Sequence, residues 1–225
     1  MLVGDLAQVD FFDTWNGVIP STDVAGITYH EPSGHLFLAD SEINETPQFL
    51  GPNIFDVPLA GDIVHGAVAS NNTEPTGITF NEFDSYFYVT NDNTRLITRY
   101  DISLDTPLEI VDTRHALSSA DDPEGITSDP ATGMLYVADG NGGGLQILAY
   151  DSDLDFQYSF PLSEMRNAEG IAFDPRDNHL LVLSDTDDAI FEYTLNGVFL
   201  AEYDISNFSP VPNTPQGLGF GPNAL

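Results

Sequence analysis

The hydrophobic positions of the chain fall into short runs that return in the same order along the sequence. Each unit opens on a glycine in a phrase such as GIT or GIA and then passes through a polar turn. A second run follows that is apolar at consecutive positions: HLFLAD, YFYVTN, MLYVAD and LLVLSD. Two further runs complete the unit, and the last of them alternates apolar with polar residues. Such runs, bounded by Gly, Pro, Asn and Asp, are typical of β-strands joined by tight turns.

The units repeat at a nearly constant spacing. Their anchoring glycines are Gly26, Gly77, Gly125 and Gly170, with a weaker QGLGF copy at Gly217, at intervals of 45–51 residues. Four strands in a repeat of this length predict an all-β fold, a β-propeller of four-stranded blades. The continuous apolar second run suits a strand covered on both faces, and the alternating last run suits an edge strand. A β-sandwich is the alternative, but it does not explain the phase of the repeat.

The sequence predicts one propeller domain over residues 1–225, with four complete blades at about 24–70, 75–119, 123–163 and 168–208. Residues 5–14 and 216–225 resemble the outermost and innermost strands of a further, incomplete blade. Two interpretations stay open: a segment of a longer chain, or a small ring with a shortened last blade. In the first unit the proline-rich stretch after HLFLAD predicts an extended loop before the third strand.

The net charge of the chain limits the classes of partner that it can bind. The chain has 36 acidic and 5 basic residues, all five of them arginine, and a formal net charge of −31. Nucleic acid is excluded as a partner because binding it needs a basic surface. Membrane insertion is not expected, because no apolar run approaches the roughly 20 residues that span a bilayer. The absence of cysteine excludes disulfides and thiolate chemistry. Repulsion among the acidic groups would be relieved by bound cations or salt.

The phrases PEGITSDPATGMLYVAD and AEGIAFDPRDNHLLVLSD resemble those of the calcium-dependent six-bladed β-propeller superfamily. This group includes the SMP-30/gluconolactonase-like, NHL-repeat and SdiA-regulated, phytase-like propellers. The resemblance covers Val24 to about Phe220. It is specific for the architecture and weak for any one activity, because such blades serve very different functions.

In the SMP-30 branch, the residue before each blade glycine points into the central channel and binds a divalent cation. Carried over by position, these slots hold Ala25, Thr76, Glu124, Glu169 and Gln216. The resemblance therefore implies that Glu124, Glu169, Gln216 and Thr76 are metal ligands, whereas Ala25 departs from the pattern. Two glutamates converging on one axis must share a proton or bind a cation, and oxygen ligands favour Ca²⁺ or Mg²⁺. The alternative is that both glutamates lie in solvated turns.

A second polar ring follows the second strand and consists of Asp40, Asn91, Asp139 and Asp185. Asx residues after an apolar strand usually bond backbone N–H groups of the adjoining turn, and we expect this role here. Carboxylates lining the mouth of a channel are the alternative.

No G-x-S-x-G elbow, H-E-x-x-H motif or phosphate-binding loop occurs in the sequence. We therefore expect an extracellular or periplasmic, calcium-binding propeller that works as a non-catalytic binding or scaffold module. Its ligand would be a small molecule or a protein at the propeller face. A metal-dependent hydrolase of the lactonase kind is the first alternative, since it needs only a cation and a carboxylate base. An NHL-type protein-interaction propeller without metal is the second.

Overall fold

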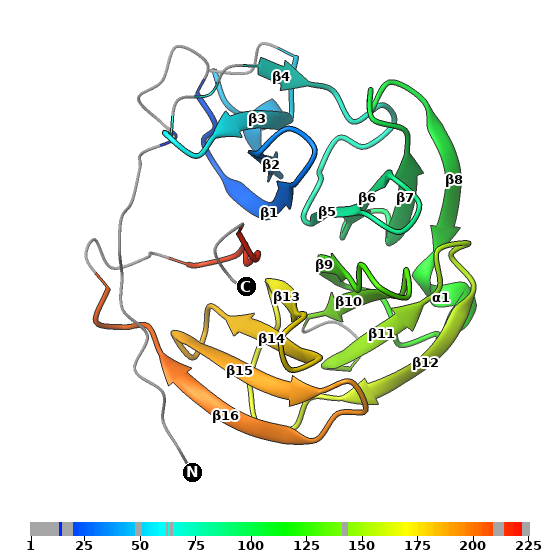
Figure 1. Cartoon of the computed structure of the whole chain (residues 1–225), viewed down its shortest axis with the longest axis vertical. Coiled ribbons are helices and arrows are strands. Elements are labelled where there is room, and N and C mark those ends of the chain that lie inside the picture. The colour runs from blue at the N-terminus through cyan, green and yellow to red at the C-terminus, as the bar shows by residue number, and fades with distance from the viewer. Residues whose placement is uncertain are drawn as a thin grey trace.

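The computed structural model describes residues 14, 20–47, 51–61, 63, 65–140, 144–208 and 214–221. They form four antiparallel sheets of four strands, arranged around a central axis (Figure 1). Within each sheet the strands are paired in sequence order, so each blade is a meander that runs from the axis to the rim. The predicted all-β propeller with four complete blades is thereby confirmed.

The first blade consists of β1 (Val24–His30), β2 (His35–Asp40), β3 (Ile54–Pro58) and β4 (His65–Ala67). The second consists of β5 (Ile78–Asn81), β6 (Tyr86–Asn91), β7 (Leu96–Tyr100) and β8 (Pro107–Asp112), followed by the short helix α1 (Thr113–Ala116). The third consists of β9 (Pro123–Ser128), β10 (Leu135–Asp139), β11 (Gln146–Tyr150) and β12 (Phe156–Pro161). The fourth consists of β13 (Ile171–Asp174), β14 (His179–Ser184), β15 (Ala189–Thr194) and β16 (Phe199–Asp204).

Between the first and fourth blades, the inner position of the ring is taken by the C-terminal segment 214–221 (Figure 1). Gly219 of this segment lies directly beside the Ile27 carbonyl of β1. The described residues of this segment form no strand pairing. The outermost strand predicted at residues 5–14 falls almost wholly outside the described residues. The loop predicted in the first blade is present: residues 41–53 separate β2 from β3 and include the 3₁₀ turn η1 (Ile43–Glu45).

The repeated glycines have a steric cause, which is the close approach of neighbouring inner strands. A Cβ atom on Gly125 would lie 2.6 Å from the Glu169 carbonyl oxygen and 2.9 Å from the Ile171 nitrogen. The Gly125 N–H donates to that same carbonyl at 2.7 Å. Contacts this short with backbone atoms leave no room for a side chain. The glycines and the isoleucines beside them thus form a constriction of the channel, here called the glycine waist, whose free space is too small for a water molecule.

The threonine two residues after the glycine also joins neighbouring blades. The Thr28 hydroxyl accepts the Phe80 N–H at 3.3 Å, and the Thr127 hydroxyl accepts the Phe173 N–H at 3.0 Å. These bonds satisfy backbone donors that no sheet ladder reaches. The Gly-Ile-Thr motif therefore allows the inner strands of neighbouring blades to pack side by side.

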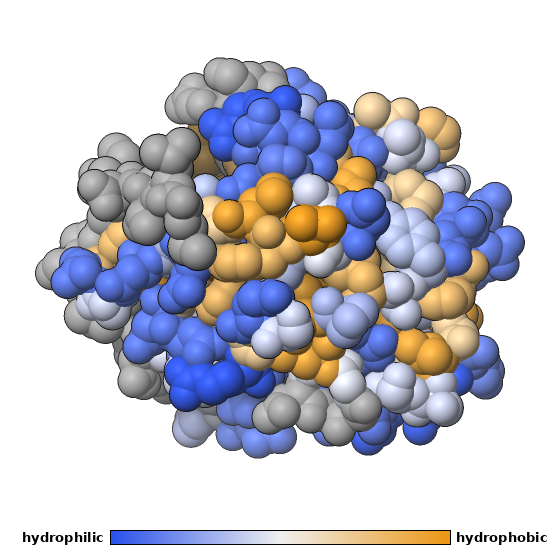
Figure 2. All heavy atoms as spheres, turned by 90° about the horizontal axis from the view of Figure 1, so that it is seen from below, coloured by the Kyte–Doolittle hydropathy of each residue, from blue (hydrophilic) through white to orange (hydrophobic). Residues whose placement is uncertain are grey.

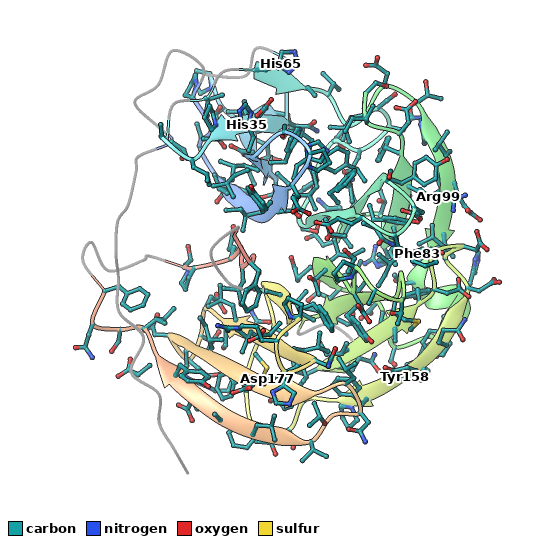
Figure 3. All side chains as sticks on the ribbon, viewed as in Figure 1. His35, His65, Phe83, Arg99, Tyr158 and Asp177 are labelled. Carbon is teal, nitrogen blue, oxygen red and sulfur yellow. The ribbon has the colours of Figure 1, made fainter. Side chains whose placement is uncertain are left out.

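The core lies between the blades, where most residues of the second and third strands are buried, and those of β10 and β11 are buried throughout. Polar contacts also connect the second and third blades: both Tyr88 and Arg99 donate to the Ser152 carbonyl, at 2.7 and 2.8 Å. Figure 3 places Arg99 near the outer side of the second blade, with Tyr158 on the rim of the third. Side chains fill the space between the sheets in the same view.

The side of the molecule seen in Figure 2 is hydrophilic around its margin, and apolar groups gather towards its middle. Exposed apolar side chains of the outer strands include Tyr158 of β12 and Leu200 of β16. Exposed apolar residues as such are ordinary on protein surfaces. No helix among the described residues is long and apolar enough to cross a membrane.

Candidate metal centre

The inner strands bring acidic side chains together at the end of the channel where these strands begin. Glu124 lies at the start of β9, and Asp122 lies two residues before it. Asp92 comes from the turn after β6 in the neighbouring blade. One carboxylate oxygen from each of Asp92, Asp122 and Glu124 lies within 4.8 Å of the other two. This trio is here called the carboxylate cluster, and it is formed by partly buried residues.

The electrostatic state of Glu124 reflects this crowding. Its pKa is raised to about 9, first by burial and then by the negative charges of Glu169, Asp92 and Asp122, in that order of importance. A carboxylate among like charges and away from water is unfavourable, so the group holds its proton or needs a counter-charge. A divalent cation within reach of the three oxygens would provide that counter-charge.

Glu169, from the adjacent blade, is also held in an unfavourable charge state. Burial, and next the negative charge of Asp185, raise its pKa to about 7, while a hydrogen bond from Asn167 opposes the rise. That bond, from the Asn167 amide to Glu169 Oε1, is 2.6 Å long, and the same amide reaches Asp185 at 3.0 Å. The negative charge of Glu169 contributes to the raised pKa of Glu124, although Glu169 lies outside the carboxylate cluster.

The remaining predicted ligands differ from one another. The buried Thr76 hydroxyl is occupied, because it donates to the Pro123 carbonyl and to Thr90 at 3.1 and 3.3 Å. Gln216 carries a side-chain oxygen that is inaccessible to water and has no hydrogen-bond partner among the described residues. A buried acceptor without a donor is costly, so this oxygen is the better prepared of the two to meet a cation or a water molecule.

The second polar ring is mostly structural. Asp40 is completely buried and accepts the N–H groups of Thr22 and Asp23 at 2.6 and 3.0 Å. Asp139, also completely buried, accepts the Asp122 N–H at 2.9 Å. In both cases the donors belong to the segment leading into the blade's own first strand, whereas we expected the turn that follows. Asp139 thereby positions the backbone of Asp122 in the carboxylate cluster.

Asn91 and Asp185 behave differently from these two aspartates. Asn91 Oδ1 accepts the Thr94 N–H of the following turn at 2.8 Å, as expected. The fourth-blade equivalent of Asp40 is Ser184, which is completely buried, and not Asp185. Asp185 instead occupies the position of Asp92, fifteen residues after the blade glycine. It lies at the channel mouth, where its charge acts on Glu169.

Sequence reasoning missed Asp92 and Asp122. A signal for Asp92 existed, since Asp92 and Asp185 share a repeat position directly after the second strand. Asp122 carried a weaker signal: the position three residues before the glycine is polar in every copy, with Asp23, Glu74, Asp122, Asn167 and Thr214. Five acidic side chains from three adjacent blades thus surround one mouth of the channel: Asp92, Asp122, Glu124, Glu169 and Asp185. Their oxygens suit a hard cation such as Ca²⁺.

No protein-family model matches the sequence, and no curated protein is similar to it in sequence. Similar solved structures exist. A streptogramin B lyase shares 18% identity with a TM-score of 0.57, over 89% of this chain and 60% of that one. Virginiamycin B lyase from Staphylococcus aureus shares 20% with a TM-score of 0.57, over 91% and 62%. A chain of a nidogen/laminin complex shares 14% with a TM-score of 0.61, over 89% and 86%.

These likenesses concern the fold. They place the chain among the β-propellers, and at such identities they carry no activity across. The chain spans about 60% of the length of the two lyases that it resembles.

Proposed function

We propose that the protein is a calcium-binding propeller that serves as a non-catalytic binding or scaffold module. The observation that carries the proposal is the carboxylate cluster, in which three acidic oxygens from two blades lie within 4.8 Å of one another. Such an arrangement is unfavourable without a counter-charge. A bound cation would connect the turn after β6 to the start of β9 and so brace adjacent blades.

Calcium is the cation that suits the site best. The available ligands are carboxylate and amide oxygens, and calcium accepts six to eight of them in irregular geometry. Three clustered carboxylates, with Glu169 nearby, resemble the ligand charge of sites in extracellular modules, which bind at about 10⁻⁴–10⁻³ M. We infer an extracellular or periplasmic location for this protein, and the support for it is the acidic composition of the chain.

A binding role is further supported by the type of fold. The chain in the nidogen/laminin complex that it resembles belongs to a protein–protein assembly, and propellers commonly present their flat faces to partners. We infer that this protein also recognises a ligand at a face, with the cation stabilising the blades that carry it.

The test is the calcium dependence of stability at constant ionic strength. A ligand that binds the folded state stabilises it by RT ln(1 + [L]/Kd). We expect the melting temperature of the wild type to rise with calcium concentration as this relation predicts. Titration calorimetry should show a single binding event. The double variant Asp92→Asn/Glu124→Gln should lose that response. The control Asp177→Asn/Glu202→Gln removes two exposed carboxylates away from the cluster and should keep it.

An equal calcium response in the cluster variant and the control would refute the site, because it would reflect general screening of the net charge. No calcium response in the wild type would leave the metal-free NHL-type interaction module as the better interpretation.

A hydrolase of the lactonase kind is the second candidate, and one observation favours it. Glu169 lies beside the carboxylate cluster with a pKa of about 7, which is suited to a general base near neutral pH. A cation at the cluster would supply the Lewis acid that polarises a lactone carbonyl. Lactone turnover that is abolished by EDTA and by Glu169→Gln would replace the binding module with this function.

A further inference from the structure

The opposite end of the channel carries a second site that is separate from the carboxylate cluster. A cavity of about 250 Å³ opens there, beyond the glycine waist. It is built from residues that follow the blade glycines on all five inner segments, from Ile27 on β1 to Gly221 at the end of the described chain. The volume is several times that of a water molecule, about 30 Å³, and close to the lower limit of small-molecule sites, about 300 Å³.

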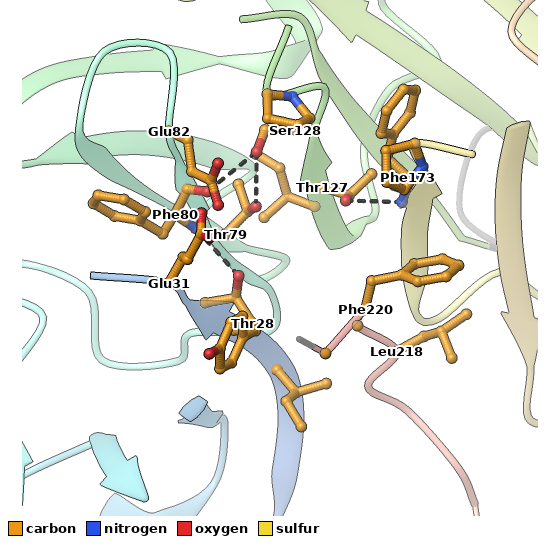
Figure 4. A pocket seen from close by; sticks show the side chains of 17 residues that line it. Thr28, Glu31, Thr79, Phe80, Glu82, Thr127, Ser128, Phe173, Leu218 and Phe220 are labelled. Atoms are coloured by element: carbon orange, nitrogen blue, oxygen red, sulfur yellow. Dashed lines mark hydrogen bonds between the residues drawn. The ribbon is translucent and has the colours of Figure 1, made fainter. Parts of the chain in front are cut away.

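The cavity has one acidic side. Glu31 and Glu82 occupy the same repeat position, five residues after their glycines, on the turns after β1 and β5. Figure 4 shows the two carboxyl groups close together at one side of the cavity. Burial, and next the negative charge of Glu31, raise the pKa of Glu82. The hydroxyl groups of Thr28 and Thr79 line the wall beside them.

The other side of the cavity is apolar. At the repeat position of the two glutamates, the third and fourth blades have Pro130 and Pro175. Phe173, Leu218 and Phe220 complete this wall and face the glutamates across the cavity in Figure 4. The replacement of Glu by Pro around the ring thus divides the cavity into a carboxylate half and a hydrophobic half.

Both acidic turns are held in place before any ligand arrives. His30, which is buried, bonds to Ser33 at 2.7 Å and contacts the Phe80 ring edge-on at 4.4 Å. Asn81, completely buried, donates to the Gly133 carbonyl at 3.1 Å and accepts the Phe83 N–H at 3.1 Å. Each anchor directly precedes its glutamate in the sequence. Preorganised polar groups of this kind lower the cost of binding a ligand.

We propose that this cavity binds a small organic amine, with its ammonium group against Glu31 and Glu82 and its apolar body against Phe173 and Phe220. Charge complementarity selects the cation: no basic residue is among the described residues that line the cavity. Arg176 lies over the Phe220 ring, 5.5 Å from its centroid, and is paired with Asp174 at 2.7 Å. Both glutamates are exposed, so an anion would be repelled by them and a neutral molecule would gain no ionic contact with them.

The experiment compares three probes of one shape by titration calorimetry at pH 7 in EDTA: benzylamine, benzyl alcohol and benzoate. EDTA removes divalent cations, so the outcome is independent of the calcium site. We expect benzylamine to bind the wild type with one site, at least about tenfold more tightly than benzyl alcohol, and benzoate to show no binding. In Glu31→Gln/Glu82→Gln, benzylamine should weaken to the affinity of the alcohol while the alcohol is unchanged.

The matched control Glu164→Gln/Glu202→Gln removes two exposed carboxylates that do not line the cavity. It should bind benzylamine as the wild type does, and circular dichroism verifies that both variants are folded. Equal weakening in the two double variants would overturn the proposal, because attraction by the total negative charge would then explain binding. Equal affinity for amine and alcohol, or no binding of benzylamine at millimolar concentration, would overturn it as well.

Discussion

Replacing Glu124 by glutamine should stabilise the protein when divalent cations are absent. In the folded state the pKa of this carboxyl group is about 9, against 4.5 for an ordinary glutamate. A raised pKa means that the folded state binds a proton that the unfolded state releases. The contribution of Glu124 to stability is therefore complete below about pH 4.5 and is lost as the pH rises towards 9.

The size of the effect follows from the pKa shift. Each pH unit above 4.5 costs about 1.4 kcal/mol, so the wild type loses up to about 3 kcal/mol at pH 7 and less than about 1 kcal/mol at pH 5. Glutamine has nearly the same shape and carries no charge, and its amide can donate to Asp92 or Asp122. In EDTA at pH 7 we expect the melting temperature of Glu124→Gln to lie up to about 6–12 °C above that of the wild type. At pH 5 the two melting temperatures should be nearly equal.

The assay is thermal and urea unfolding from pH 5 to pH 8, in EDTA and then with calcium. Glu202→Gln, an exposed change that removes the same charge, controls for net charge and should alter stability by less than about 0.5 kcal/mol. With calcium present, the wild type should become more stable than Glu124→Gln, since the variant lacks one of the carboxylates that bind the ion. A Glu124→Gln protein that is no more stable than the wild type at pH 7 in EDTA would refute the reasoning, as would a gap that does not depend on pH.

Three further predictions concern the frame of the site. Gly125→Ala should lower the free energy of unfolding by about 1–3 kcal/mol in urea, because its Cβ meets the backbone of the next blade. Gly144→Ala, whose Cβ would lie in open space, should have little effect. Equal urea midpoints for the two variants would contradict this prediction. Gly140→Ala would bring a methyl group 2.8 Å from Asp122 Oδ2, so calorimetry should show weaker calcium binding with nearly unchanged stability in EDTA, and an unaltered affinity would count against the cluster. Asp139→Ala leaves a buried backbone N–H without an acceptor and should cost about 1–3 kcal/mol; a neutral effect on the urea midpoint would show that this carboxylate is not structural.

The repeat made most of the fold predictable. Strands β2, β6 and β15 have the bounds of the apolar runs HLFLAD, YFYVTN and AIFEYT, because turn residues delimit each run on both sides. The propeller itself followed from the constant phase of the glycines. Their steric reason, a neighbouring backbone 2.6 Å from the missing Cβ of Gly125, required coordinates because it depends on how closely the blades pack.

The site was only partly predictable, for a related reason. Glu124 and Glu169 were accessible from the repeat because they share one position on the inner strands. Asp92 and Asp122 lie in connecting segments, whose path depends on contacts such as the bond from the Asp122 N–H to Asp139. Asp185 was grouped with Asp40, although the residue at the same distance from the blade glycine is Ser184. The one-residue offset could be counted in the sequence, but its effect on the direction of the side chain depends on how the strands pair.

The glycine waist has a consequence for traffic through the molecule. Because the free space between the glycines and isoleucines at that level is too small for a water molecule, the cavity at one end is separated from the carboxylate cluster at the other. A small molecule in the cavity and a cation at the cluster would therefore each enter from its own side. They could influence one another through their charges or through a shift of the inner strands between them.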